Sequence, residues 1–435
     1  MLLVAFFCLA LSRSTATAAP PERVPGEVIV RFKPTATAAD VGEFMDELGA
    51  TRLHRFPSIR AEHHRITLAS VEDAVSRFRG HRAIEFIEPN YIVRADAVPD
   101  DPQFHLLWGL QNTGQTGGTP GADIGAVSAW DVQTGSPAVV VAVIDTGVDI
   151  HHPDLAANIW ANPGEIPGNQ IDDDGNGLID DVHGYDFYNR DPDPTDDVGH
   201  GTHVAGTIAA VGNNSLGISG VAWTARIMPL KFLGADGSGP VSAAVECIDY
   251  AVQMGAHILN NSWGGAGFSA ALQLAIQGAN AQGIPFVAAA GNGGASLDTF
   301  RHYPASYDVP NVIAVASTTH QDVLSSFSNY GATTVHLAAP GSSIWSTRPG
   351  AEYGYESGTS MAAPHVSGAL ALLRAEFPSM PGSELKNVLL SSVAPVPSLQ
   401  GFVLTGGRLD LARMLAGPDS IPPTPITGSL PSTSA

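Results

Sequence analysis

The middle and later parts of the chain alternate short apolar runs with segments of helical periodicity. The run at 139–144 contains no polar residue, which is typical of a strand buried on both faces of a parallel sheet. Similar runs stand at 227–232, 258–260, 285–290 and 312–316. Because helical patterns fit between these runs, residues 100–415 are predicted to form one α/β domain with a doubly wound, mostly parallel sheet.

The N-terminal part shows a different pattern, in which short strands and helices mix. Residues 27–32 alternate like a strand, 41–48 form an amphipathic helix, and 64–68 read as a second strand. A helix at 71–78 and a final pair of strands within 84–93 follow. Residues 22–98 are therefore predicted to form a separate small α+β domain, which at this size is only marginally stable by itself.

Both ends of the chain differ from these domains. Residues 2–11 form an apolar run that is too short to span a bilayer. Ala16, Thr17 and Ala18 follow it and fit a signal-peptidase site. We therefore predict a signal peptide at 1–18, a secreted protein and no membrane span. The last stretch, 418–435, is rich in Pro, Ser and Thr and is predicted to be a disordered tail.

Charge and cysteine content narrow the classes of partner. The net charge is −21, and residues 1–98 contribute nothing to it, with 12 basic and 12 acidic side chains. The following part is strongly acidic and would repel a phosphate backbone, so nucleic acid is not expected as a partner. Cys8 falls in the signal peptide, which leaves Cys247 without an internal partner and suggests a small buried residue.

Three short segments carry candidate chemistry. Asp145 ends the apolar run at 139–144, His200 opens a helical segment that also contains His203, and Ser360 follows Gly-Thr at another helix start. Each has an ordinary alternative: a turn-capping Asp, a pair of metal-binding histidines, and an N-cap Ser. Zinc is disfavoured because the glutamate of an HExxH motif is missing.

Taken together, these segments in the order Asp, His, Ser resemble the subtilisin family (subtilases), in particular its thermitase-like calcium-binding members. The resemblance covers residues 100–415 and is preceded by a segment similar to the family's inhibitory propeptide. It implies a secreted serine endopeptidase that acts through an acyl-enzyme, processes its own precursor and cleaves protein or peptide substrates. Asp145, His200 and Ser360 would form the triad, and Asn292 would donate to the oxyanion.

The resemblance also implies which segments bind the substrate. The expected contacts are Gly237, Ser238 and Gly239 on one edge, Ser262, Trp263 and Gly264 on the other, and Ala289, Ala290 and Gly291. Trp263 is bulkier than the leucine common in the family, and His302 is expected near the pocket floor. Because these walls carry no charge, large apolar P1 residues such as Phe, Leu or Tyr are predicted.

Residues 172–197 contain ten Asp and one basic residue, Arg190, which predicts structural Ca²⁺ because hard cations prefer oxygen ligands. A loop similar to an EF-hand would use Asp172, Asp174, Asn176, the Leu178 carbonyl and Asp180. It departs from that motif because His183 replaces the final glutamate. A solvated acidic loop without metal is the alternative.

The family resemblance implies two further calcium sites. One would use Asp186, Asn189, Asp191, Asp193 and Thr195. The other would use Asp101, Asp154, Asn214 and the carbonyls of Val211, Leu216 and Ile218.

Other function classes fit the sequence less well. A catalytically dead subtilase that serves as a binding domain would not need Asp145, His200, Asn292 and Ser360 together. An acid-acting relative would have a carboxylate at position 292. A serine esterase would place its nucleophile in G-x-S-x-G, whereas Ser360 lies in G-T-S-M-A.

Overall fold

The computed structural model describes residues 23–92 and 98–416, so the predicted signal peptide at 1–18 and the tail at 418–435 lie outside the described residues. The chain divides into two compact units, Met1–Ala95 and Asp96–Ala435. Each unit has its own hydrophobic core.

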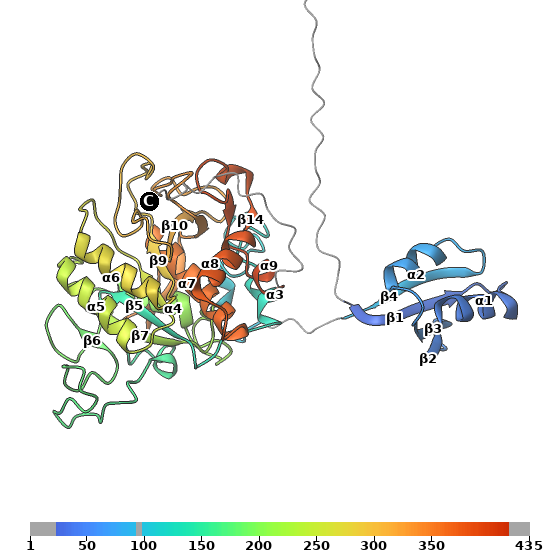
Figure 1. Ribbon diagram of the computed structural model, residues 1–435, viewed down its shortest axis with the longest axis horizontal. Coiled ribbons are helices and arrows are strands. Elements are labelled where there is room, and N and C mark those ends of the chain that lie inside the picture. The colour runs from blue at the N-terminus through green and yellow to red at the C-terminus, as the bar shows by residue number, and fades with distance from the viewer. Residues whose placement is uncertain (1–22, 93–97, 417–435) are drawn as a thin grey trace, which may run out of the picture. The chain divides into compact units, whose positions relative to one another are not determined.

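The first unit is a four-stranded antiparallel sheet, in the order β2-β3-β1-β4, covered by two helices (Figure 1). Its core joins Val28 and Ile87 of the sheet to Phe44 and Phe78 of the helices. The elements are β1 (Arg23–Phe32), α1 (Ala38–Leu48), β2 (Thr51–Phe56), β3 (Ala61–Arg65), α2 (Val71–Phe78) and β4 (Ile84–Tyr91).

Three details of this unit differ from the sequence prediction. The second predicted strand lies at 61–65 instead of 64–68, because the chain leaves the sheet after Arg65 to enter the cap of α2 at Ser70. The strand β2 was not predicted, since it has no apolar alternation and its first five residues are exposed. The predicted final strand pair is the single strand β4.

The second unit is built on one large sheet. Among the described residues it has nine strands in the order β14-β15-β11-β10-β9-β8-β5-β7-β6, parallel throughout except for the β14–β15 pair. The strands are β5 (Val140–Asp145), β6 (Tyr185–Asp186), β7 (Arg226–Lys231), β8 (Ile258–Asn261), β9 (Phe286–Ala289), β10 (Val312–Thr318), β11 (Leu337–Pro340), β14 (Ala394–Pro395) and β15 (Gly407–Arg408). A separate hairpin joins β12 (Ile344–Arg348) to β13 (Glu352–Glu356).

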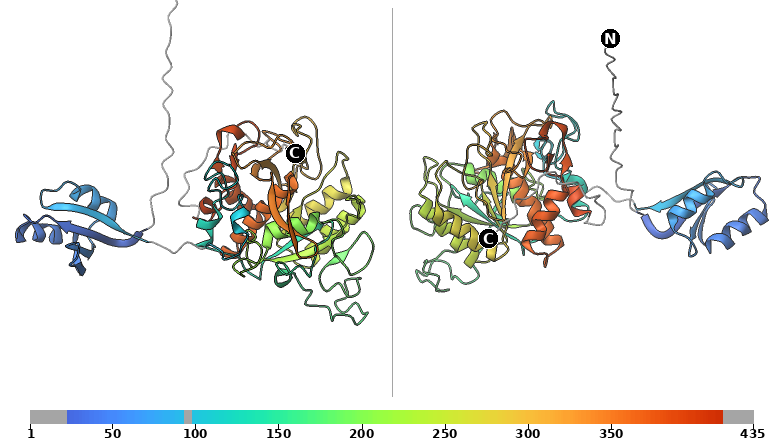
Figure 2. Two further views of the ribbon diagram at one scale, coloured as in Figure 1. Left: turned by 180° about the vertical axis from the view of Figure 1, so that it is seen from behind. Right: turned by 45° about the horizontal axis from the view of Figure 1, so that its top comes forward.

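Helices cover both faces of this sheet, with α5 and α6 on one side and α7 and α8 on the other (Figures 1 and 2). Within β5, Val141 and Val143 face the α7 side, whereas Ala142 and Ile144 face the α5 side. The helices are α3 (Ala126–Trp130), α4 (His200–Ala209), α5 (Val241–Gln253), α6 (Ala270–Ala281), α7 (Thr359–Glu376), α8 (Gly382–Ser391) and α9 (Leu411–Leu415). The predicted doubly wound α/β class is confirmed.

The topology gathers the polar motifs at one end of the sheet. Asp145 ends β5, Ser262 follows β8 and Asn292 follows β9, so all three lie beyond the carboxyl ends of neighbouring parallel strands. This is the edge where open α/β sheets hold their functional groups. In the described part of the chain, no helix has the length and apolar character that crossing a membrane requires.

Candidate active site

Asp145 and His200 form a direct pair. Nδ1 of His200 lies 2.7 Å from Oδ1 of Asp145, which also accepts the N–H of Thr146 at 2.7 Å. Asp145 is fully buried and His200 is partly exposed at the start of α4. The buried carboxylate therefore fixes the imidazole with the proton on Nδ1, which leaves Nε2 able to accept a proton.

Asp196, which the sequence reading missed, holds this pair in place. Its Oδ1 accepts from Oγ1 of Thr146 at 2.9 Å and from the backbone N–H of Gly199 at 2.8 Å. Its Oδ2 accepts both the N–H and the hydroxyl of Thr202, at 2.9 and 2.7 Å. Asp196 thus supplies the acceptors that the start of α4 needs, since its N-cap residue is Gly199. An acidic residue four positions before His200 was the available signal.

The two histidines of α4 have opposite electrostatics. Burial disfavours the charged form of His200, but the charge and hydrogen bond of Asp145, helped by Glu356 and Asp196, outweigh it and raise the pKa of His200. His203 is fully buried, and burial lowers its pKa to about 3, so it stays neutral. Nε2 of His203 donates to the carbonyls of Ile344 and Gly354. His203 therefore supports the β12–β13 hairpin.

Ser360 lies in the first turn of α7. Its hydroxyl donates to the backbone oxygen of Ser262 at 2.9 Å, and the hydroxyl of Ser262 donates back to the Ser360 oxygen at 2.8 Å. These two bonds tie the start of α7 to the end of β8. For Ser360 to attack a carbonyl, its hydroxyl has to rotate from Ser262 towards Nε2 of His200.

The Asn292 side chain is oriented by Thr359. Its Oδ1 accepts the N–H of Thr359 at 2.9 Å and the Thr359 hydroxyl at 3.0 Å. The amide group of Asn292 is thereby left free to donate on the side of the cleft. Thr359 also accepts the N–H of Gly291 at 2.9 Å, so it connects the segment after β9 to the start of α7.

These groups line a cleft of about 390 Å³. Its lining residues are Thr146, Val198, His200, Leu233, Gly237, Ser262, Trp263, Gly264, Ala289, Gly291, Asn292, His302, Thr359 and Ser360. Six of the nine expected substrate contacts are among them. Ser238 and Gly239 lie beside the cleft in the exposed turn after Gly237, and Ala290 is buried beneath it.

The sequence model of the subtilase family matches residues 136–407, and that of the fervidolysin N-terminal prodomain matches residues 12–90. This chain belongs to the subtilase family. The family and the propeptide-like segment that the sequence suggested are both confirmed, and the subtilase is a serine endopeptidase with an N-terminal prodomain.

Individual relatives agree with this assignment. A thermophilic serine proteinase of Bacillus sp. (strain AK1) is 39% identical over 354 residues, which cover 81% of this chain and 79% of the relative. Thermitase of Thermoactinomyces vulgaris is 44% identical over 253 residues, covering 58% and 80%. A solved structure of a protease from Pseudoalteromonas arctica PAMC 21717 matches with a TM-score of 0.61 and 31% identity, over 74% of this chain and 99% of that one.

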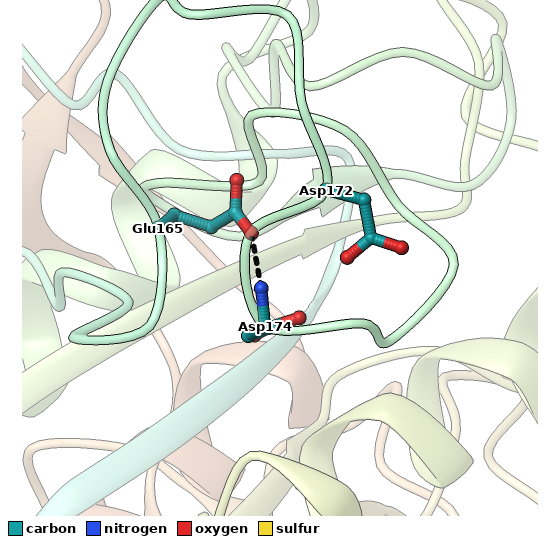
Figure 3. A group of neighbouring side chains, drawn as sticks. All are labelled: Glu165, Asp172 and Asp174. Carbon is teal, nitrogen blue, oxygen red and sulfur yellow. Dashed lines mark hydrogen bonds between the residues drawn. The ribbon is translucent and has the colours of Figure 1, made fainter.

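The acidic loop of this subtilase gathers three carboxylates. Glu165, Asp172 and Asp174 can each place an oxygen within 4.8 Å of the others, as Figure 3 shows. Glu165 was missed because it stands outside the linear EF-hand spacing. Its Oε1 accepts the N–H groups of Asp173 and Asp174 at 2.9 and 3.2 Å, which folds the loop back on it.

The other residues expected in this loop are placed differently. Oδ1 of Asn176 accepts the N–H of Leu178, and its amide donates to Asp174. Asp180 points to the neighbouring turn, where its carboxylate accepts the N–H groups of Gly168, Asn169 and Gln170.

In the next part of the chain, 186–195, the carboxylates accept backbone N–H groups two or three residues further along. Asp186 accepts from Tyr188 and Asn189, Asp191 from Asp193, and Asp193 from Thr195. This loop brings no three carboxylates close together. Within the described ranges, the group of three that does converge is Glu165, Asp172 and Asp174.

The third expected site contains two buried carboxylates. Asp101 accepts the N–H groups of Asn213 and Asn214, and Asp154 accepts the Asn214 amide at 2.8 Å and the Ile218 N–H at 2.9 Å. Burial raises the pKa of Asp101 and of Asp154, and the charge of Asp101 adds to the rise at Asp154. The carbonyls expected from Val211, Leu216 and Ile218 belong to the same loop.

Proposed function

We propose that this subtilase is a secreted, self-processing endopeptidase that cleaves peptide bonds through an acyl-enzyme on Ser360. The observation that carries the proposal is the convergence of the Asp145–His200 pair, Ser360 and Asn292 on one cleft. The prodomain match supports processing, and the apolar run at 2–11 supports export.

The proposed mechanism follows from the protonation states of these groups. Nε2 of His200 takes the proton of Ser360 as its oxygen attacks the scissile carbonyl, and it later gives this proton to the leaving amine. Asp145 stabilises the imidazolium formed in between and is not itself protonated. Water then attacks the acyl-enzyme: Nε2 of His200 takes a proton from the water and gives it to the Ser360 oxygen, which leaves as the acid product is released.

Asn292 would stabilise the oxyanion together with the backbone N–H of Ser360. Replacing it with leucine, which has a similar shape and no donor, is expected to lower kcat by about 10²–10³-fold, a size taken over from the corresponding asparagine of subtilisin. The KM for peptide substrates should change little, because the bond forms mainly in the transition state. Steady-state kinetics on purified Asn292→Leu and wild type check this. A loss of kcat/KM that comes only from a higher KM, with kcat unchanged, would contradict the assigned role.

We propose that the first unit is an inhibitory propeptide removed by the enzyme itself. The junction is expected within 94–99, between the end of β4 and Asp101, in a stretch that includes residues outside those described. Mass spectrometry of the N-terminus of the purified mature enzyme locates it. A mature enzyme that still begins before residue 90 would contradict the proposal.

We also propose a preference for large apolar P1 residues, because the cleft walls at Trp263, Gly264, Ala289 and Gly291 carry no charge. Profiling the mature enzyme on a peptide library, with the cut bonds identified by mass spectrometry, tests both the activity and this preference. Cleavage after Phe, Leu or Tyr is expected. Faster cleavage after Arg than after Phe in matched peptides would overturn the preference, and no cleavage at all would overturn the function.

The proposal includes structural Ca²⁺ at two places. Glu165, Asp172 and Asp174 offer converging oxygens. Asp101 and Asp154 are buried acids whose hydrogen-bond donors in the described chain are neutral, and the charge of Asp100 adds to the negative charge near Asp101. Oxygen-only sets of this kind suit Ca²⁺. The ion would hold loops together and take no part in the chemistry.

Removing Ca²⁺ is therefore expected to shorten the half-life at elevated temperature, because a ligand bound only by the folded state stabilises it by about 2.7 kcal/mol at a hundred times its Kd. The half-life of the folded state is compared in Ca²⁺ and in chelator. The enzyme is first inhibited covalently, so that it cannot digest itself. Asp172→Asn with Asp174→Asn should reduce the difference, whereas Glu384→Gln, an exposed acid on α8, should not. Equal half-lives and no calcium by elemental analysis would contradict the claim.

A further inference from the structure

His302 places its imidazole between two walls of the cleft. A Cβ atom on Gly264 would clash with Nε2 of His302, and one on Gly291 would lie 2.9 Å from the same nitrogen. Gly264, Gly291 and His302 all line the cleft. The ring edge therefore occupies space that exists because both wall residues lack a side chain.

The backbone around His302 is held without using the ring. Tyr303 pairs with Gly265, with N–H to oxygen distances of 2.7 and 2.8 Å in the two directions. The N–H of His302 donates to the Ser306 hydroxyl at 3.1 Å, and its carbonyl accepts the Ser306 N–H at 2.9 Å. These bonds hold the His302 backbone beside the segment 262–265, and neither ring nitrogen has a hydrogen-bond partner among the described residues.

The unused ring nitrogens set His302 apart in residues 98–416. Every other buried or half-buried histidine of this range has a hydrogen-bonded ring nitrogen: His152, His183, His200, His203, His257, His320, His336 and His365. Among the described residues, neither ring nitrogen of His302 is a fully buried atom without a hydrogen-bond partner. Both nitrogens therefore keep some exposed surface, and His302 is a lining residue of the cleft.

The imidazole is expected to be neutral when the enzyme works. Burial lowers the pKa of His302, and no charged group opposes this shift. A neutral imidazole has one N–H donor and one acceptor nitrogen. Its best partner is a group that can use either of them, such as a hydroxyl at the end of a large side chain.

We propose that His302 is a specificity-determining residue that recognises the end of the P1 side chain and makes tyrosine the preferred residue. The phenol hydroxyl would bond a ring nitrogen, while the aromatic ring lies between the uncharged walls. This inference rests on the proposed function, since it requires the P1 side chain to enter the cleft beside Trp263 and Gly264.

The test uses peptides that differ only at P1, which is tyrosine, phenylalanine or 4-methylphenylalanine. The last matches tyrosine in shape and lacks the hydroxyl. Wild-type kcat/KM is expected to be about fivefold higher for tyrosine than for either analogue, the effect of one net hydrogen bond. In His302→Leu the ratio should fall to about one, and His302→Asn, which keeps a donor and an acceptor, should retain part of it.

His151→Leu serves as the control, because His151 is exposed and lies outside the cleft lining. It should keep the wild-type ratio. The inference would be overturned if the ratio of kcat/KM for tyrosine over its analogues were unchanged in His302→Leu. Equal wild-type values for tyrosine and 4-methylphenylalanine would also overturn it, and this comparison does not depend on the folding of a variant. If none of the three peptides is cleaved, the proposed function itself fails.

Discussion

Replacing Ser360 with alanine is expected to lower kcat by about 10⁶-fold, the size known for the corresponding change in subtilisin. The physical reason is that the other hydroxyls described along the cleft are engaged elsewhere: Thr146 donates to Asp196, and Thr359 donates to Asn292. The Ser262 hydroxyl, which also lies at the cleft, donates to the Ser360 backbone oxygen. Without Ser360 the enzyme has neither a nucleophile for peptides nor one for its own junction, so the precursor should accumulate with residues 22–95 attached.

The measurement is kcat on a cleaved peptide together with intact mass after expression in a protease-free host. Ser383→Ala, which changes an exposed serine at the start of α8, is the matched control and should mature normally. A Ser360→Ala protein that still matures in such a host would show that removal of the prodomain does not depend on Ser360, and self-processing would be wrong. Residual activity near the wild-type level would show that Ser360 is not the nucleophile.

Replacing Asp145 with asparagine is expected to lower kcat by about 10⁴-fold, the loss known for the same change in a serine-protease triad. Asparagine is nearly the same size, so the fold should survive. Its amide, however, can donate to Nδ1 of His200, which favours the tautomer with the proton on Nε2. That tautomer presents no base to Ser360.

The pH profile should change in the same variant. Asp145 stabilises the protonated imidazole and so raises the pKa of His200. The wild-type enzyme therefore gains activity as the pH rises through this raised pKa, because His200 must be neutral to act as a base. Without the charge of Asp145 the pKa of His200 falls, and the rising limb of kcat/KM should move to lower pH.

Asp149→Asn removes a charge outside the pair, on a residue whose N–H donates to Thr202 of α4, and controls for the overall electrostatic change. It should leave the limb close to its wild-type position. A limb that stays in place in Asp145→Asn would mean that another group than His200 controls the activity.

The sequence predicted the sheet well because its strands are buried on both faces. Runs such as 139–144 and 312–316 contain no polar residue, because neither face of the strand meets solvent. They correspond to β5 and β10. In contrast, β2 pairs at the edge of the first unit through Arg52 and His54, which are exposed. Its backbone pairing is set by β3, and this is not encoded in an apolar pattern.

Residues that act through long-range contacts were harder to predict. Asp145, His200, Asn292 and Ser360 stood in motifs, and the structure brings them to one cleft. Glu165 joins the acidic loop only after the chain folds back on it, and Thr359 orients Asn292 across 67 positions of sequence. The leftover ring nitrogens of His302 become visible only when the partners of the other histidines are known.

The most direct test of the account is to identify the residue that reacts with an organophosphorus fluoridate. Mature wild-type enzyme is treated with the reagent, and intact mass and peptide mapping locate the adduct. The account predicts one adduct per molecule on Ser360, with activity lost in proportion, and none in His200→Ala, where no base activates the hydroxyl. An adduct on another residue, or labelling of Ser360 that proceeds equally without His200, would contradict it.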